Sequence, residues 1–269
     1  MIQKILFPVD FSPACAAMAA YVKRAAEMFG ARVTILHVCD LVSHNAWELY
    51  FRPAVDIAED RQAIAQESLD SFLASEFAAP ACTRLLASGE AAEQIAQTAR
   101  TGGFDLIVMP THAGRFRRML LGSTTAKVLD DADCPVMTTE HAAAEVPRPL
   151  EHRVWGCAIG LSEDSQRVLH VAGRASAAAG AKLFVIHAAR EDAANDVHRR
   201  VDEVLSVAGC KAEVHIATGP IKAALLDAAQ RLAVDALIVG RKPRTVALGR
   251  LRDLTYSLVR DSPVPVLSV

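Results

Sequence analysis

The chain has 269 residues with a formal net charge of −2, and 52% of its residues are hydrophobic although only 5% are aromatic. The near-neutral charge argues against a general nucleic-acid binder, which usually carries a strong basic excess. At about 150 residues per domain the length predicts two domains, each large enough to bury a core without a metal ion or a disulfide.

In the first half, short apolar runs alternate with helical segments. The run 4–9 predicts a strand that ends at Asp10-Phe11-Ser12-Pro13, and Asp or Ser followed by Pro is typical of a helix start. The pattern predicts helices at 14–29, 55–77, 91–100 and 124–129, and further strands at 32–38, 84–87, 106–109 and 135–138. Because these strands are apolar on both faces, we predict an α/β, doubly wound domain with a five-stranded, mostly parallel sheet flanked by helices.

The second half repeats the first. At an offset of 150 residues the segment 5–10 aligns with 155–160, and at an offset of 130 residues 104–109 aligns with 234–239. Two separate registers indicate a duplicated domain in which one connection of the second copy is shorter. We therefore predict two tandem domains, copy one at residues 1–142 and copy two at residues 150–269, joined by a linker rich in Ala and Pro.

Several function classes find no support in the sequence. The six cysteines form no CxxC pair and the nine histidines form no HxxxH or HxH cluster, so we expect reduced, buried thiols and no metal site. Ser12 and Ser162 follow strands but lack the G-x-S-x-G elbow of hydrolases. With no signal segment and no apolar run near the ~18 residues that cross a bilayer, we expect a cytoplasmic protein without membrane contact.

Three features of copy one follow strands, at the sheet edge where doubly wound folds bind ligands. The Asp10 carboxylate could accept hydrogen bonds from an adenine amino group or a ribose hydroxyl, or simply cap a helix. The loop after the fourth strand carries Gly114 and three arginines, and could wrap an anion or be an ordinary solvated loop. Gly122-Ser123-Thr124 opens a helix, which exposes N–H groups that suit a phosphate, or a simple cap. Together the three features predict a nucleotide site.

These residues resemble those of the universal stress protein family, here with two domains in tandem. The resemblance rests on the stretches 5–12 and 36–38, on 109–112 running into 120–123, and on 134–136. It implies that an adenine nucleotide binds to copy one: ATP, or else ADP or AMP, with Mg²⁺. The site residues that it implies are Pro8, Val9 and Asp10 near the adenine, Val38 through its backbone, Met109, Pro110, His112, Gly114 and Arg115 around the ribose and phosphates, and Gly122, Ser123 and Thr124 on the phosphate chain.

The sequence departs from the family pattern of Gly, two residues, Gly, nine residues, then Gly-Ser or Gly-Thr. Pro110 stands where the first Gly would be, the second falls at Ala113 or Gly114, and the stretch to Gly122 is one residue shorter. Since Pro has no N–H and Ala adopts a positive φ only at a cost, we expect an altered phosphate loop.

Copy two departs further from the family pattern. Asp10, Gly122 and Ser123 correspond to Gly160, Arg252 and Asp253. Asp253 would place a negative charge where a phosphate would lie. We therefore predict that copy two is a structural and pairing domain.

The leading hypothesis is a stress-response protein that binds an adenine nucleotide in copy one and is regulatory, with at most weak ATP hydrolysis. His112 could assist phosphoryl chemistry or form neutral hydrogen bonds. The alternatives are a tandem scaffold that binds no nucleotide and an adenylyl-transfer enzyme of a related fold, which the absence of a clear general base disfavours.

Assembly is predicted from the last strand of each copy. Both of these strands, 135–138 and 265–268, are apolar edges that need a partner, so we expect the two copies to pair through them about a pseudo-twofold axis. Trp47, Tyr50 and Phe51 gather in the longer connection of copy one and could form a lid or a further interface in a homo-oligomer.

Overall fold

A computed structural model describes residues 2–40, 54–111, 121–139, 152–190, 194–241 and 250–269. Copy one contributes the strands β1 (Lys4–Val9), β2 (Arg32–Cys39), β3 (Cys82–Ser88), β4 (Leu106–Pro110) and β5 (Val136–Thr139) and the helices α1 (Pro13–Ala17), α2 (Ala19–Phe29), α4 (Ala54–Ser71), α5 (Ala91–Thr101) and α6 (Ser123–Asp131). Copy two contributes the strands β6 (Val154–Ala158), β7 (Lys182–Ala189), β8 (Glu213–Thr218), β9 (Ala236–Val239) and β10 (Val266–Ser268) and the helices α7 (Ser165–Ala179), α8 (Ala194–Ala208), α9 (Ile221–Arg231) and α10 (Arg250–Asp261).

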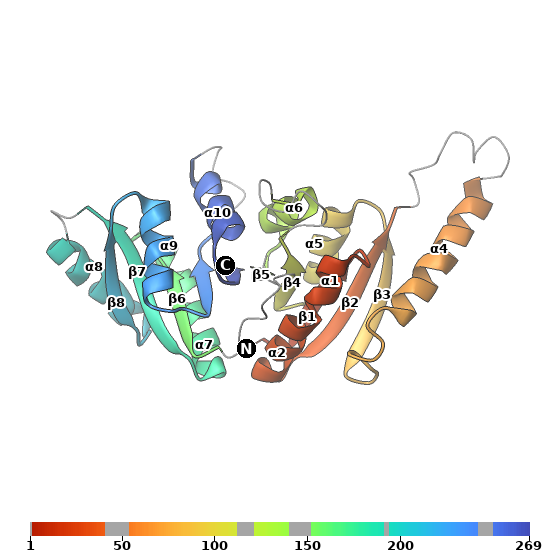
Figure 1. Ribbon diagram of the computed structural model, residues 1–269, viewed down its shortest axis with the longest axis horizontal. Helices are drawn as coiled ribbons and strands as arrows, with labels where there is room; N and C mark the ends of the chain where they lie inside the picture. Colours follow the sequence, from red (N-terminus) through yellow and green to blue (C-terminus); the bar gives the residue numbers. More distant parts are fainter. Residues whose placement is uncertain (1, 41–53, 112–120, 140–151, 191–193, 242–249) are drawn as a thin grey trace.

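The ten strands form one sheet in the order β3-β2-β1-β4-β5-β10-β9-β6-β7-β8 (Figure 1). Within each copy all neighbouring strands are parallel, and the copies join where β5 and β10 pair antiparallel, with Val266 opposite Thr138 and Ser268 opposite Val136. The predicted fold class is confirmed, and so is the pairing of the two final strands. The two predicted sheets are, however, halves of a single sheet, because that pairing continues the hydrogen-bonded ladder from one copy into the other.

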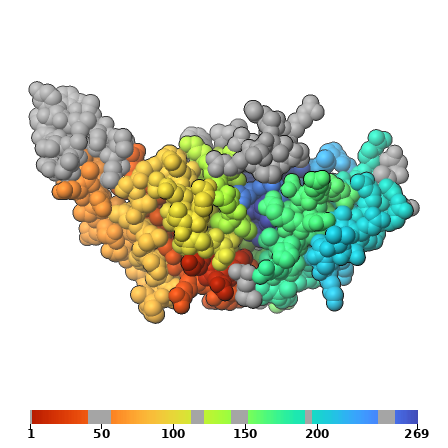
Figure 2. Space-filling view, turned by 180° about the vertical axis from the view of Figure 1, so that it is seen from behind, coloured from red at the N-terminus to blue at the C-terminus, as the bar shows by residue number. Residues whose placement is uncertain are grey.

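Two core layers, one on each face of the sheet, run through both copies. Residues of α1, α2, α4, α7 and α8 pack on one face, and residues of α5, α6, α9 and α10 pack on the other. Figure 2 shows the C-terminal segment, in blue, between the two halves of the molecule. Consistent with the strongly apolar runs, β4 and β5 are buried along their whole length.

The predicted helix start after β1 has the expected chemistry. Ser12 is the N-cap of α1, its Oγ accepts a hydrogen bond from Cys15 N at 3.3 Å, and Pro13 takes the first helical position. The predicted helix 14–29 is divided at Met18 into α1 and α2. Gly30 ends α2 with a φ of 63°, and Gly180 ends α7 with a φ of 64°, so the stop signal is repeated at the 150-residue offset.

The predicted helix 55–77 was too long. Helix α4 ends at Ser71, and Leu73 has a φ of 52°, a left-handed conformation that turns the chain out of the helix. The Arg84 guanidinium donates hydrogen bonds to the carbonyls of Leu69 and Phe77, which stabilises this turn. Helical periodicity in the sequence continues past the turn and therefore conceals it.

The sequence predicted that a single connection of copy two is shorter than its counterpart in copy one, and this prediction was wrong. Copy two is shorter both before and after the helix that follows its second strand. Residues 72–81 separate α4 from β3, whereas only 209–212 separate α8 from β8. Trp47, Tyr50 and Phe51 lie outside the described residues, as does the proposed domain boundary at 143–149.

Candidate functional site

The strand order reverses between β1 and β4, which makes the carboxyl ends of these strands the place where a doubly wound sheet binds its ligand. Asp10 directly follows β1 and Thr111 directly follows β4. In copy two the corresponding strands are β6 and β9, followed by Ile159-Gly160 and by Gly240-Arg241.

The ladder at this point differs between the two copies. Strand β1 pairs with β4 at only two positions, Ile5↔Leu106 and Leu6↔Ile107, whereas β6 pairs with β9 at four positions. Pro8 and Pro110, which have no N–H to donate, lie in the unpaired stretch of copy one. The residues at these positions in copy two, Ala158 and Gly240, retain their N–H groups. The hydrogen-bonded ladder between β1 and β4 therefore ends before the candidate site, although the two strands remain neighbours.

Asp10 is exposed and its carboxylate is organised by the start of α1. Oδ1 accepts hydrogen bonds from Ser12 N at 3.0 Å and from the Cys15 thiol at 3.1 Å. Partial burial by itself would raise the pKa of Asp10, but the hydrogen bonds from Ser12 and Cys15 outweigh it and keep the pKa below its ordinary value. Ser12 rather than Asp10 is the N-cap of the helix. Asp10 is thus an oriented, ionised acceptor at the sheet edge.

Helix α6 begins with N–H groups that have no acceptor within the helix. Gly122 is its N-cap, no side chain caps this end, and the first turn contains no acidic residue. Gly122 N donates to Thr111 O at 3.0 Å, and Ala126 N donates to Gly122 O at 2.8 Å. By helix geometry the N–H groups of Ser123, Thr124 and Thr125 have no carbonyl partner within α6. This end is therefore suited to bind an anion.

Thr111 connects the end of β4 with the start of α6. Its side chain is 1% exposed, and its Oγ1 has no hydrogen-bond partner among the described residues. Thr125 Oγ1 donates to Pro110 O at 3.1 Å, so the first turn of α6 is bonded to the end of β4. A buried hydroxyl without a partner is uncommon in folded proteins. Thr111 is next to the start of α6, since its carbonyl accepts the hydrogen bond from Gly122 N.

The structure brings together part of the residue set predicted from the sequence. Met109 and the half-buried Val38 pack in the same core layer as α5 and α6, and Pro8 and Val9 are buried at the end of β1. Gly122, Ser123 and Thr124 begin α6, as expected. His112, Gly114 and Arg115 fall outside the described residues, so the predicted basic loop stays a prediction.

Sequence analysis overlooked the structural roles of Thr111 and Thr125. A signal for Thr125 did exist, because its counterpart Thr255 donates to Gly240 O at the same distance of 3.1 Å. His37 and His187 behave alike as well, with Nδ1 atoms 2.8 and 2.9 Å from the carbonyls of Val9 and Ile159. Polar residues repeated in both copies therefore bond the backbone.

Copy two differs from copy one at the positions that correspond to this site. Helix α10 begins at Arg250, so residues 252 and 253, the counterparts of Gly122 and Ser123, lie inside a helix instead of opening one. Gly160 offers no carboxylate where copy one has Asp10. Among the described residues, no three His, Cys, Asp or Glu side chains gather as a metal site would require. None of the described helices is both long and apolar enough to span a membrane.

Comparison with known proteins agrees with this geometry. The sequence model of the universal stress protein family matches residues 1–139. The chain is 32% identical over 138 residues to a universal stress protein of Thermus aquaticus, covering 51% of this chain and 98% of that one. It is 30% identical over 152 residues to the universal stress protein MJ0531 of Methanocaldococcus jannaschii, covering 53% and 85%.

The fold of the whole chain also has a solved relative. A universal stress protein from Archaeoglobus fulgidus superposes with a TM-score of 0.74 at 23% identity, covering 98% of this chain and 97% of that one. The sequence match extends over copy one, and the structural match extends over both copies. The chain therefore belongs to the universal stress protein family.

Proposed function

We propose that this protein is a stress-response protein that binds an adenine nucleotide, ATP, in copy one, and that it is regulatory rather than catalytic. The observation that carries the proposal is the set of donors at the end of β4: the buried Thr111 hydroxyl, without a partner among the described residues, and the first N–H groups of α6, which have no carbonyl partner within the helix. They lie at the strand-order reversal, where β1 and β4 are no longer paired.

The proposed binding mode assigns a role to each side of the site. The ionised Asp10 carboxylate accepts hydrogen bonds from the adenine or the ribose, and Val38 adds backbone contacts. The N–H groups of Ser123 and Thr124 and the positive end of the α6 dipole bind the phosphates. Pro8, Val9, Met109 and Pro110 form the floor, and the loop with His112, Gly114 and Arg115 completes the phosphate contacts, with Mg²⁺ as a companion of the bound nucleotide.

We assign no hydrolytic step to this site. The described residues that follow β1 and β4 comprise one oriented carboxylate and one hydroxyl, and the Asp10 pKa below its ordinary value makes it a poor proton acceptor near neutral pH. The proposal includes the domain limits 1–142 and 150–269, a cytoplasmic location and further homo-oligomerisation. The rival is a tandem scaffold of the same fold that binds no nucleotide.

A pair of substitutions at Ser123 tests the proposal. Ser123 is exposed at the first position of α6, so it can be replaced without disturbing the core. Ser123→Asp copies the residue of copy two and adds a negative charge at the helix start, which stabilises the helix by about 0.3–1 kcal/mol. The same charge repels phosphate. Ser123→Asn has nearly the same shape without the charge.

The measurement is isothermal titration calorimetry with ATP at fixed salt and Mg²⁺, beside mass spectrometry of nucleotide released from denatured protein. We expect ATP binding by the wild type, near wild-type affinity for Ser123→Asn, and at least tenfold weaker binding for Ser123→Asp. Ser123→Asp should nevertheless be equally or more stable. No binding by the wild type at millimolar ATP would favour the scaffold instead.

A further inference from the structure

Copy two contacts α6 and the turn that follows it through the side chains of Arg241 and Tyr256. The Arg241 guanidinium donates from Nη1 to Leu129 O at 2.7 Å and to Ala132 O at 3.1 Å, and from Nη2 to Cys134 O at 2.7 Å. Leu129 lies in the last turn of α6, and Ala132 and Cys134 follow it. The Leu129 carbonyl is one that a helix end leaves without an internal donor, and the other two belong to the residues that lead from α6 to β5.

Tyr256 adds a second contact farther along the same helix. Its hydroxyl lies 3.1 Å from Ala126 O and also bonds Asp130 Oδ1. The residues of copy one at the positions of Arg241 and Tyr256 are Thr111 and Ala126, and neither side chain is long enough to return the contact. Among the described residues, the contacts of Arg241 and Tyr256 with copy one are therefore not repeated by the residues at the equivalent positions of copy one.

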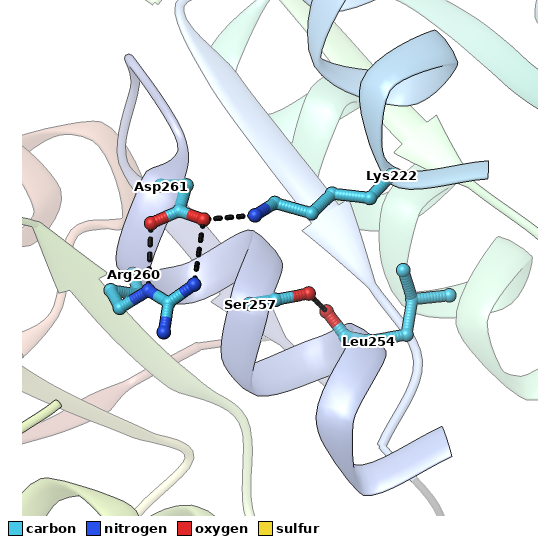
Figure 3. A network of polar contacts seen from close by, with 5 residues as sticks. All are labelled: Lys222, Leu254, Ser257, Arg260 and Asp261. Atoms are coloured by element: carbon cyan, nitrogen blue, oxygen red, sulfur yellow. Dashed lines mark hydrogen bonds and ion pairs between the residues drawn. The ribbon is translucent and has the colours of Figure 1, made fainter. Parts of the chain in front are cut away.

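The residues that hold α6 are themselves anchored in copy two. Tyr256 belongs to α10, whose last residue, Asp261, bonds Lys222 at the start of α9 and Arg260 beside it (Figure 3). Hydrogen bonds from Arg260 and, to a smaller extent, Lys222 lower the pKa of Asp261 to about 2, so it stays ionised at neutral pH. Arg241 N donates to Val269 O at 2.6 Å, and Arg167 Nη2 donates to Arg241 O at 3.1 Å. A rearrangement of copy two would therefore be transmitted to α6.

The opposite end of α6 is the proposed phosphate site. A nine-residue helix is about 14 Å long and moves as a rigid element, so a tilt at its C-terminal half changes the direction of its N-terminal N–H groups. Within copy one, α6 is held by its buried residues Thr125, Val128 and Leu129 and by the hydrogen bond of Thr125 to Pro110 O. Two ion pairs add to this, Lys127 with Glu90 at 3.0 Å and, just after the helix, Arg100 with Asp133 at 2.6 Å. Both pairs are largely exposed, and such pairs contribute little.

We infer that Arg241 and Tyr256 are positioning residues through which copy two sets the nucleotide affinity of copy one. This inference rests on the proposed function and gives copy two a regulatory role that its lack of a site of its own leaves open. Coupling between separate sites usually changes affinity by about 5-fold to 150-fold, and it is reciprocal. Nucleotide bound at the start of α6 should therefore also strengthen the hold of copy two on α6.

The test compares two conservative substitutions on α10 in the full chain. Tyr256→Phe removes the hydroxyl that bonds α6 and leaves the ring in place. The control, Thr255→Val, removes a hydroxyl that bonds Gly240 O within copy two. Each loses a side-chain hydroxyl from the same helix, so a purely structural role predicts similar effects of both on stability and none on ATP affinity.

Two quantities are measured: ATP affinity by calorimetry, and the hydrogen exchange of α6 amides by mass spectrometry, with and without ATP. We expect Tyr256→Phe to weaken ATP binding at least 5-fold and to speed α6 exchange, and ATP to slow exchange in α10 of the wild type. Thr255→Val should leave affinity and α6 exchange unchanged. Equal ATP affinity of the wild type and Tyr256→Phe would overturn the inference while leaving the proposed function intact. Failure of the wild type itself to bind ATP overturns the proposed function first.

Discussion

Replacing Arg241 by Met should show how much the junction between the copies depends on one side chain. Arg241 is largely buried, and burial lowers its pKa below the ordinary value, a sign of a costly environment for a charge. Its three hydrogen bonds end on the carbonyls of Leu129, Ala132 and Cys134. Met is unbranched, flexible and apolar, so the substitution removes the donors while keeping most of the aliphatic packing of the side chain.

The magnitude follows from two opposing effects. Each buried carbonyl left without a donor costs about 1–3 kcal/mol, which gives about 3–9 kcal/mol for three. Removing a buried guanidinium relieves a desolvation cost of several kcal/mol, and Nε already lacks a partner among the described residues. We therefore expect Arg241→Met to lower the free energy of unfolding by about 2–4 kcal/mol, a large part of the stability of an ordinary domain.

Urea unfolding followed by circular dichroism measures this change. Arg167→Met is the matched control, because Arg167 is exposed and its contacts stay within copy two. It should lose less than about 1 kcal/mol, as for most surface substitutions. Arg241→Lys should fall between the wild type and Arg241→Met, since one ammonium group does not reproduce the guanidinium fork. A loss below about 1 kcal/mol for Arg241→Met would refute the reasoning.

Three further predictions concern ionisable groups. Burial lowers the pKa of His152, whose Nδ1 has no partner among the described residues, so the free energy of unfolding of the wild type should fall as pH drops below about 6.5. His152→Ile, which copies Ile2 of copy one, should lack this dependence in urea titrations from pH 8 to 5. Because the pKa of Asp261 is about 2, its ionised form should contribute its full stabilisation above about pH 4 and lose it as pH falls towards 2. Asp261→Asn should reduce this loss of stability at acid pH. An unchanged loss would contradict the ion pairs of Asp261. Burial, together with the neighbouring Asp10, raises the pKa of Cys15 to about 12, so this thiol should resist iodoacetamide in native protein at pH 8. Peptide mapping measures the labelling, and rapid labelling of Cys15 would contradict the prediction.

Much of the architecture follows from the sequence alone. The apolar run 4–9 matches β1 (Lys4–Val9), and Gly30 and Gly180 end their helices as the pattern indicates. Such features are local: a short apolar run has too few residues for a helix, and a glycine accepts the left-handed conformation that a helix end requires. The internal repeat in the sequence predicted that the domain is duplicated, and the apolar final strands predicted the pairing of β5 with β10.

The candidate site was only partly accessible from sequence. Asp10 and Gly122-Ser123-Thr124 could be found because each directly follows a strand or opens a helix. The part played by Thr111 could not be found, since an unpartnered hydroxyl is defined by its surroundings and not by its neighbours in the chain. The early end of the ladder between β1 and β4 likewise depends on how two strands about a hundred residues apart in the sequence align.

The hold of copy two on α6 was decided by tertiary structure alone. Arg241 and Tyr256 reach carbonyls more than a hundred positions away in the sequence, and the repeat offers no hint, because Thr111 and Ala126 stand at their places in copy one. Periodicity and propensity describe what a segment does with its own backbone. Which carbonyl a long side chain reaches depends on the antiparallel joining of β5 and β10, which brings the end of α6 beside residues from the other half of the chain.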